Sequence, residues 1–128
     1  MMNSSNVELD SRSSSIEKLK DRFKRYAINV AVLITKLPKN NINSVYGNQE
    51  IRCSSSTGAN YRAACRAKSK ADFINKLKIV EEETDESIYF LELLLFFNPE
   101  LKDEFPALIK EGNELLAIAV ASIGTARG

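Results

Sequence analysis

Apolar residues recur at alternating steps of three and four residues through most of this chain of 128 residues. The clearest run consists of Ile16, Leu19, Phe23, Tyr26, Val30, Leu33 and Leu37. Such spacing places side chains along one face of an α-helix, and no segment shows the strict alternation of a half-buried strand. The pattern therefore predicts an all-α protein, folded as an antiparallel up-down-up-down four-helix bundle.

Cap and turn signals set the expected limits of the domain and of its first helix. We expect a flexible polar tail over residues 1–14, which are rich in Ser and Asn, and a single bundle domain over residues 15–127. Ser14 followed by Glu17 fits a capping box, in which two side chains satisfy backbone amides at a helix start. Pro38 disfavours helical backbone at the residue before it, so the first helix should end there.

Three further helices are expected. The second should cover about 44–67 after an Asn-rich turn, and the third should begin at the N-cap Ser69. The fourth should begin with Asp103 as its N-cap and end at Gly124 or Gly128. The second helix is the least apolar, and small residues are expected on its inward face. These are Cys53, Ser56, Asn60, Ala63 and Ala67.

We make separate predictions for two polar residues of the second helix, Asn60 and Tyr61. We expect Asn60 to be an amide in the bundle core that fixes the register of packing, as polar core residues can do. Tyr61 has two interpretations. It either stacks on a nucleic-acid base at the rim or packs at a subunit contact.

The chain has no His, so it lacks the commonest neutral general base and the commonest metal ligand. Ser-His-Asp and Cys-His catalysis are therefore excluded, and the serines at 54–56 have no base to activate them. The acidic residues at 81–86 also lack the Glu-x-x-His partners that di-metal bundles use. We expect no catalytic residue, no bound metal and no cofactor.

Cysteine placement and hydropathy indicate a cytoplasmic protein. Cys53 and Cys65 fall on one predicted helix, about 18 Å apart at the usual helical rise. A disulfide requires Cα atoms within about 7 Å, so no internal bridge is expected. The sequence also has no uninterrupted apolar window of about 18 residues and no secretory-type start.

Opposite charges are separated along the middle of the chain, although the net charge is only +1. Residues 52–78 contain seven positive residues and one negative, a sum of +6, whereas residues 81–92 contain six negatives and no positive. Antiparallel packing around a turn near Ser69 would place Arg52 opposite Glu86, which favours ion pairs within or between chains. The alternative is a contact with nucleic-acid phosphates. That contact would use Arg62, Arg66, Lys68, Lys70 and Lys76.

Apolar residues also occupy faces that a four-helix core of this length does not need. An exposed patch of this kind usually marks a partner surface, so we expect a homo-oligomer. The expected interface residues are Ile28, Val32, Leu95, Phe96 and Phe97.

The central stretch 52–87 carries a recognisable motif. Its matching positions are Gly58-Ala59-Asn60, Arg62, Arg66, Ser69-Lys70, Asp72-Phe73 and the acidic run from Glu82 through Glu86 to Ser87. The stretch resembles the 23S rRNA-intervening-sequence proteins, a four-helix-bundle family, and the resemblance extends over about residues 16–127. Phe90 stands where a Trp is usual, and Gly124 stands where Lys is common.

The resemblance implies a bundle that assembles into ring-like pentamers and has no known enzymatic activity. A related bundle is an accessory protein of a reverse transcriptase and binds nucleic acid. We therefore expect a non-catalytic, homo-oligomeric assembly or adaptor protein. The alternative is an accessory protein that binds RNA or another nucleic acid, with a nucleic-acid enzyme as partner. Neither a membrane nor a small-molecule substrate is indicated by the sequence.

Overall fold

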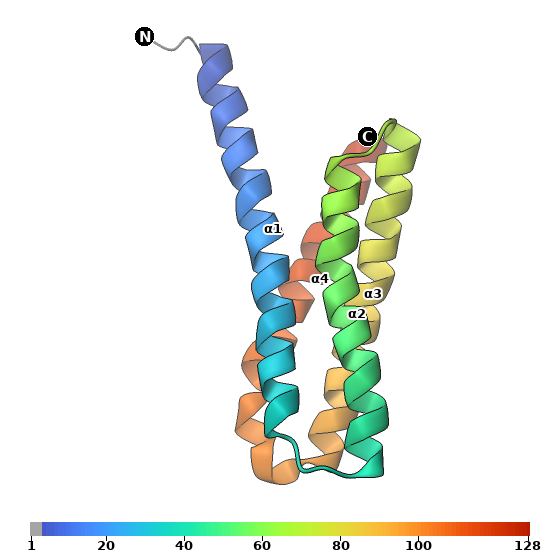
Figure 1. Ribbon diagram of the computed structural model, residues 1–128. Coiled ribbons are helices and arrows are strands. Elements are labelled where there is room, and N and C mark those ends of the chain that lie inside the picture. Colours follow the sequence, from blue (N-terminus) through green and yellow to red (C-terminus); the bar gives the residue numbers. More distant parts are fainter. Residues whose placement is uncertain (1–3) are drawn as a thin grey trace.

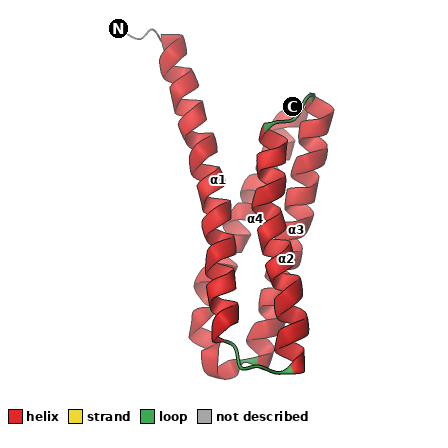
Figure 2. Ribbon diagram, in the orientation of Figure 1, coloured by secondary structure: helices red, strands yellow, loops and turns green. Residues whose placement is uncertain are grey.

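The computed structural model describes residues 4–128, with side chains described from Ser14 onward. Its elements are α1 (Ser4–Lys36), α2 (Asn41–Cys65), α3 (Lys70–Phe97), a 3-10 helix η1 (Pro99–Glu104) and α4 (Pro106–Arg127). Within residues 4–128 there is no strand, and helices joined by short loops make up the fold (Figure 2). The all-α four-helix architecture predicted from the apolar spacing is therefore confirmed.

The helices alternate in direction along one long axis (Figure 1). The α1–α2 loop and η1 lie at one end of the bundle, and the α2–α3 turn and the C-terminus lie at the other. Helix α1 packs along the bundle near the first end and diverges from the other helices toward its own N-terminus (Figure 1). The second end is therefore the more open one.

Three helices begin at residues other than those predicted, and the first two are α1 and α2. Helix α1 begins at Ser4 rather than Ser14, because no Pro or Gly interrupts residues 4–14. Most of the predicted tail thus belongs to α1, while residues 1–3 lie outside the described part. Helix α2 begins at Asn41, where the side chain of Asn40 accepts a hydrogen bond from the Asn43 amide.

The predicted N-cap of the last helix is also wrong. Asp103 lies inside η1, and α4 begins at Pro106 without a side-chain cap. Proline favours the first helical position because its ring fixes φ and the missing amide would have no helical partner there. The predicted cap at Ser69 is confirmed, since its hydroxyl accepts a hydrogen bond from the Asp72 amide at 3.1 Å.

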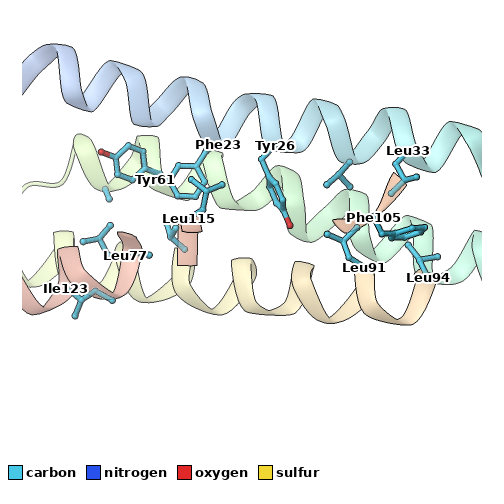
Figure 3. Close-up of a cluster of buried hydrophobic side chains, with 14 of the residues drawn as sticks. Phe23, Tyr26, Leu33, Tyr61, Leu77, Leu91, Leu94, Phe105, Leu115 and Ile123 are labelled. Carbon is cyan, nitrogen blue, oxygen red and sulfur yellow. The ribbon is translucent and has the colours of Figure 1, made fainter. Parts of the chain in front are cut away.

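The apolar seam predicted for α1 and the buried face of α3 form the centre of the core (Figure 3). Phe23, Tyr26 and Val30 of α1 are buried, as are Leu77 and Leu91 of α3. Burial of this apolar surface is the main favourable term in folding. The core is completed from α4 by buried Leu115, Ala119 and Ile123 and, just before that helix, by Phe105.

Helix α2 turns a different face inward from the one predicted. Ser56, Asn60, Ala63 and Ala67 are only half-buried. The residues that are buried along this helix are Asn43, Gly47, Glu50, Cys53, Ser54, Thr57, Tyr61 and Ala64. After Cys53, the true seam therefore lies one residue away from the predicted one.

No helix in the described residues 4–128 combines the length and the apolar character needed to cross a membrane.

Candidate functional site

Five basic residues gather at the end of the bundle that carries the α2–α3 turn. This basic cluster consists of Arg62, Arg66, Lys68, Lys70 and Lys76, and all but the half-buried Lys76 are exposed. Among the side chains that the structure describes, none of the ion pairs includes a member of the basic cluster. Its charges are therefore available to an external partner.

The acidic run on α3 divides into a paired part and an unpaired part. Arg52 of α2 lies 3.0 Å from a Glu86 carboxylate oxygen and 3.4 Å from one of Glu83. The predicted opposition of Arg52 and Glu86 is thus confirmed. Glu82 and Asp85 are exposed, and within the described side chains neither takes part in an ion pair.

One donor set near Arg52 could in principle hold a metal ion. The Cys53 sulfur and carboxylate oxygens of Glu83 and Glu86 lie within 4.8 Å of one another. Metal binding requires the thiolate, but burial raises the pKa of the Cys53 thiol to about 12, and the thiol donates a hydrogen bond to the Gln49 carbonyl. The Arg52 guanidinium already supplies positive charge to both carboxylates, so the geometry favours an ion-pair cluster.

A buried polar chain that the sequence analysis missed crosses the middle of the core. Ser87 of α3 donates a hydrogen bond to the Glu50 carboxyl of α2, and the Tyr26 hydroxyl of α1 lies 2.7 Å from the Ser87 oxygen. Glu50 is fully buried, and its second oxygen, Oε2, has no hydrogen-bond partner among the residues that the structure describes.

Burial raises the pKa values of Glu50 and Tyr26 in this buried polar chain. Removal from water disfavours the carboxylate, and the negative charge of Glu86 adds to that effect, so the pKa of Glu50 is raised to about 8. Burial likewise raises the pKa of Tyr26. The signal in the sequence was the continuation of the heptad spacing from Asn43 through Gly47 to Glu50. A charged residue at such a position is easily read as solvent-facing.

Aromatic rings form a continuous strip over α2 and α3. The strip runs in the order Tyr89, Phe90, Tyr46, Phe97 and Phe96, and each ring contacts the next with centroids between 5.1 and 6.1 Å apart. Phe96 is 77% exposed and Tyr89 is 56% exposed. Tyr46 and Phe90 had no place in the predicted interface. Only the packing of α2 against α3 shows that Tyr46 and Phe90 connect the exposed rings of the strip.

The predicted interface residues separate into exposed and core-packed ones. Ile28 and Val32 of α1 are about half exposed, and Phe96 and Phe97 belong to the aromatic strip. Leu95 is different, because it is partly buried and packs against the core. It supports the bundle rather than a free surface.

The predictions for Asn60 and Tyr61 need correction. The Asn60 amide donates to the carbonyl and hydroxyl oxygens of Ser56, one turn earlier, so it bonds within its own helix. Tyr61 is 7% exposed and stacks on Phe23 with ring centroids 5.2 Å apart. It is a core residue, and both earlier interpretations placed it at a surface.

Comparison with known proteins identifies the family. No family model and no curated protein matches this chain. A solved structure does match, that of a protein with unknown function from the S23 ribosomal protein family of Bacteroides thetaiotaomicron VPI-5482. The two chains are 30% identical and superpose with a TM-score of 0.75, over 85% of this chain and 97% of the other. The chain belongs to the S23 ribosomal protein family.

Membership in the S23 family confirms the resemblance that the motif indicated. Gly58 lies where α1 and α2 approach closely, and a Cβ added there would stand 3.2 Å from the Cβ of Phe23. Glu86 pairs with Arg52, whereas Glu82 is exposed. These motif positions thus serve helix packing and surface charge in this S23 protein. The S23 neighbour is itself a protein of unknown function, so it brings no assigned activity to this chain.

Proposed function

We propose that this S23 family protein is a non-catalytic assembly module that associates with copies of itself through the aromatic strip. The observation that carries the proposal is the continuous ring contact from exposed Tyr89 to exposed Phe96 and Phe97, which passes through the half-buried rings of the strip. Monomeric soluble proteins rarely expose contiguous apolar patches, and aromatic residues are enriched at the centres of protein interfaces.

Charge complementarity supports a second copy of the chain as the partner. The unpaired acids Glu82 and Asp85 and the basic cluster stand on the same molecule, whose net charge is only +1. One copy can therefore offer positive charge where the next offers negative charge, and complementary charges steer association. The family resemblance suggests a ring of five. We place this assembly in the cytoplasm, where Cys53 and Cys65, both free thiols in the structure, would stay reduced.

The decisive experiment measures mass in solution. We expect light scattering after size-exclusion chromatography to give five times the 14.3 kDa of one chain. Phe96→Glu should dissociate the assembly by placing an unpaired charge at the most exposed ring.

Val120→Glu is the matched control. Val120 is also exposed, but it lies on α4, outside the aromatic strip, so this variant should keep the wild-type mass. Circular dichroism checks that both variants remain helical. A wild-type protein that runs as a 14.3 kDa monomer at micromolar concentration would overturn the proposal.

A second candidate function is nucleic-acid binding. It is favoured because no ion pair among the described side chains includes a member of the basic cluster. Exposed Arg and Lys side chains bind phosphates and release counterions, whatever the base sequence. Filter binding of a structured RNA should then weaken as salt rises. Arg62→Glu with Arg66→Glu should abolish retention, and Lys102→Glu, on the distant η1, should not. RNA retention that is unchanged by the double substitution would rule out this role.

A further inference from the structure

The open end of the bundle contains a cavity of about 610 Å³. All four helices contribute to its lining: Ile16 and Lys20 from α1, Tyr61 from α2, Lys70 and Phe73 from α3, and Ala126 from α4. Its volume falls within the range of about 300–1,000 Å³ that is usual for small-molecule sites. The cavity lies by the α2–α3 turn, away from the α1–α2 loop end where Phe96 and Phe97 complete the aromatic strip (Figure 1).

The interior of this cavity is apolar and well supported. Tyr61 and Ala64 are buried, and Tyr61 is held by its stacking on Phe23 (Figure 3). Phe73 is half-buried, and Ile16 keeps 40% of its surface exposed. Helix α1 diverges from the other helices at this end (Figure 1), and the accessible part of the lining is formed by Ile16 and Phe73.

Among the side chains that the structure describes, the ionic residues of the lining are Lys20 and Lys70, and both are positive. Lys20 bonds to Glu17 at 3.0 Å, an exposed pair of the kind that contributes little free energy and exchanges readily. Lys70, which has no ion pair among the described side chains, is exposed and begins α3. Arg66 and Lys68 flank the lining residue Ala67 in the chain and add to the positive field.

We propose that this cavity binds a small free amphiphile with one alkyl chain and a carboxylate. The alkyl chain would displace water from the accessible surface of Ile16 and Phe73, and the carboxylate would meet the ammonium groups of Lys20 and Lys70. An apolar pocket with a few convergent polar groups is the usual form of a ligand site. A cationic amphiphile of equal chain length would fit the same volume but would be repelled by both lysines.

Cys65 provides a direct report of occupancy. It lines the cavity and is half-buried, whereas Cys53 is fully buried in the core. A maleimide should therefore label Cys65 in the folded protein and Cys53 only on unfolding. Decanoate, used below its micelle concentration, should slow Cys65 labelling at least several-fold. Decyltrimethylammonium should leave the labelling rate unchanged.

Two variants test the charge and the volume separately. Lys20→Glu with Lys70→Glu should remove the protection by decanoate, while Lys24→Glu with Lys102→Glu, exposed lysines outside the lining, should retain it. Ala126→Phe should occupy part of the cavity and weaken decanoate binding in calorimetry. Circular dichroism verifies the fold of every variant.

The outcomes either support or overturn the site. Equal protection by the anionic and cationic amphiphiles would overturn it, as would protection that survives both the charge reversal and Ala126→Phe. Binding of phosphatidylglycerol vesicles without any protection by free decanoate would overturn it in favour of a lipid surface. Because Cys65 reports locally, a monomeric result in the mass experiment leaves this test intact.

Discussion

At the scale of single residues, Glu50 is the least expected feature of this protein. It is fully buried, Oε2 has no hydrogen-bond partner among the described residues, and Ser87 is its hydrogen-bond donor. The Tyr26 hydroxyl lies 2.7 Å from the Ser87 oxygen and extends this hydrogen-bonded series to α1. A buried carboxylate without a positive partner is costly, so the neutral acid is the form that the core accommodates.

We therefore predict that Glu50→Gln flattens the dependence of stability on pH. The pKa of Glu50 is about 8 in the folded protein against an ordinary 4.5, so folding retains a proton that the unfolded chain releases. The loss of folding stability caused by ionising Glu50 is absent below pH 4.5, grows between the two pKa values and is complete above pH 8. Urea denaturation measures this loss. Between pH 4.5 and pH 8, the free energy of unfolding of the wild type should fall by on the order of a few kcal/mol relative to that of Glu50→Gln.

The control for this prediction is Glu82→Gln, which neutralises an exposed carboxylate on α3. It should follow the wild-type pH dependence closely. Parallel losses of stability in the wild type and in Glu50→Gln would show that Glu50 is already ionised in the folded protein.

At the scale of elements, α4 contains two glycines with opposite surroundings. A Cβ at Gly112 would stand 2.9 Å from Ile88 Cγ1 and 3.0 Å from the Tyr26 hydroxyl, whereas a Cβ at Gly124 would meet nothing within 4 Å. Gly112 is thus the residue that lets α4 approach α1 and α3 beside the buried polar chain.

This contrast gives a paired prediction. Gly112→Ala should destabilise the bundle by about 1–3 kcal/mol, because overpacking forces neighbouring side chains to move. Gly124→Ala should stabilise it by about 0.5 kcal/mol, since alanine is the better helix former. Thermal denaturation of the two single variants measures both effects. Equal stabilisation by the two substitutions would mean that the contact at Gly112 is loose.

Helix α2 shows why its inward face was misplaced. Ser54, Ser56, Thr57 and Gly58 differ little in hydropathy, so the spacing of small residues supports two neighbouring registers equally well. The packed structure selects the register that buries Tyr61 against Phe23. An aromatic ring offers far more apolar area than the small side chains do, and its burial decides between the alternatives.

At the scale of the whole molecule, apolar and charged surfaces lie at different places along the bundle. The aromatic strip reaches the end that carries η1, and the basic cluster occupies the end with the α2–α3 turn (Figure 1). The aromatic contact and nucleic-acid binding would therefore use separate regions of one chain. Only the charge contacts between copies would compete with phosphates for the basic cluster.

The two functions should respond differently to salt. Burial of aromatic rings is not screened by ions, while phosphate contacts weaken steadily with the logarithm of salt concentration. We expect the oligomer mass to stay constant across a salt series in which RNA retention falls. Light scattering and filter binding in the same buffers measure both. Dissociation to single chains at high salt would indicate that charge pairs, rather than the aromatic strip, hold the assembly together.

The sequence by itself determined the all-α class, the main seam of α1, the cap at Ser69 and the opposition of Arg52 and Glu86. These follow from local spacing and antiparallel register, which a single chain encodes directly. Only the tertiary structure decided that Glu50 is buried, that Tyr61 belongs to the core, and that rings from two helices join into one strip. Each of these depends on which face of one helix meets another, and near-equivalent faces are distinguished only when all the helices pack together.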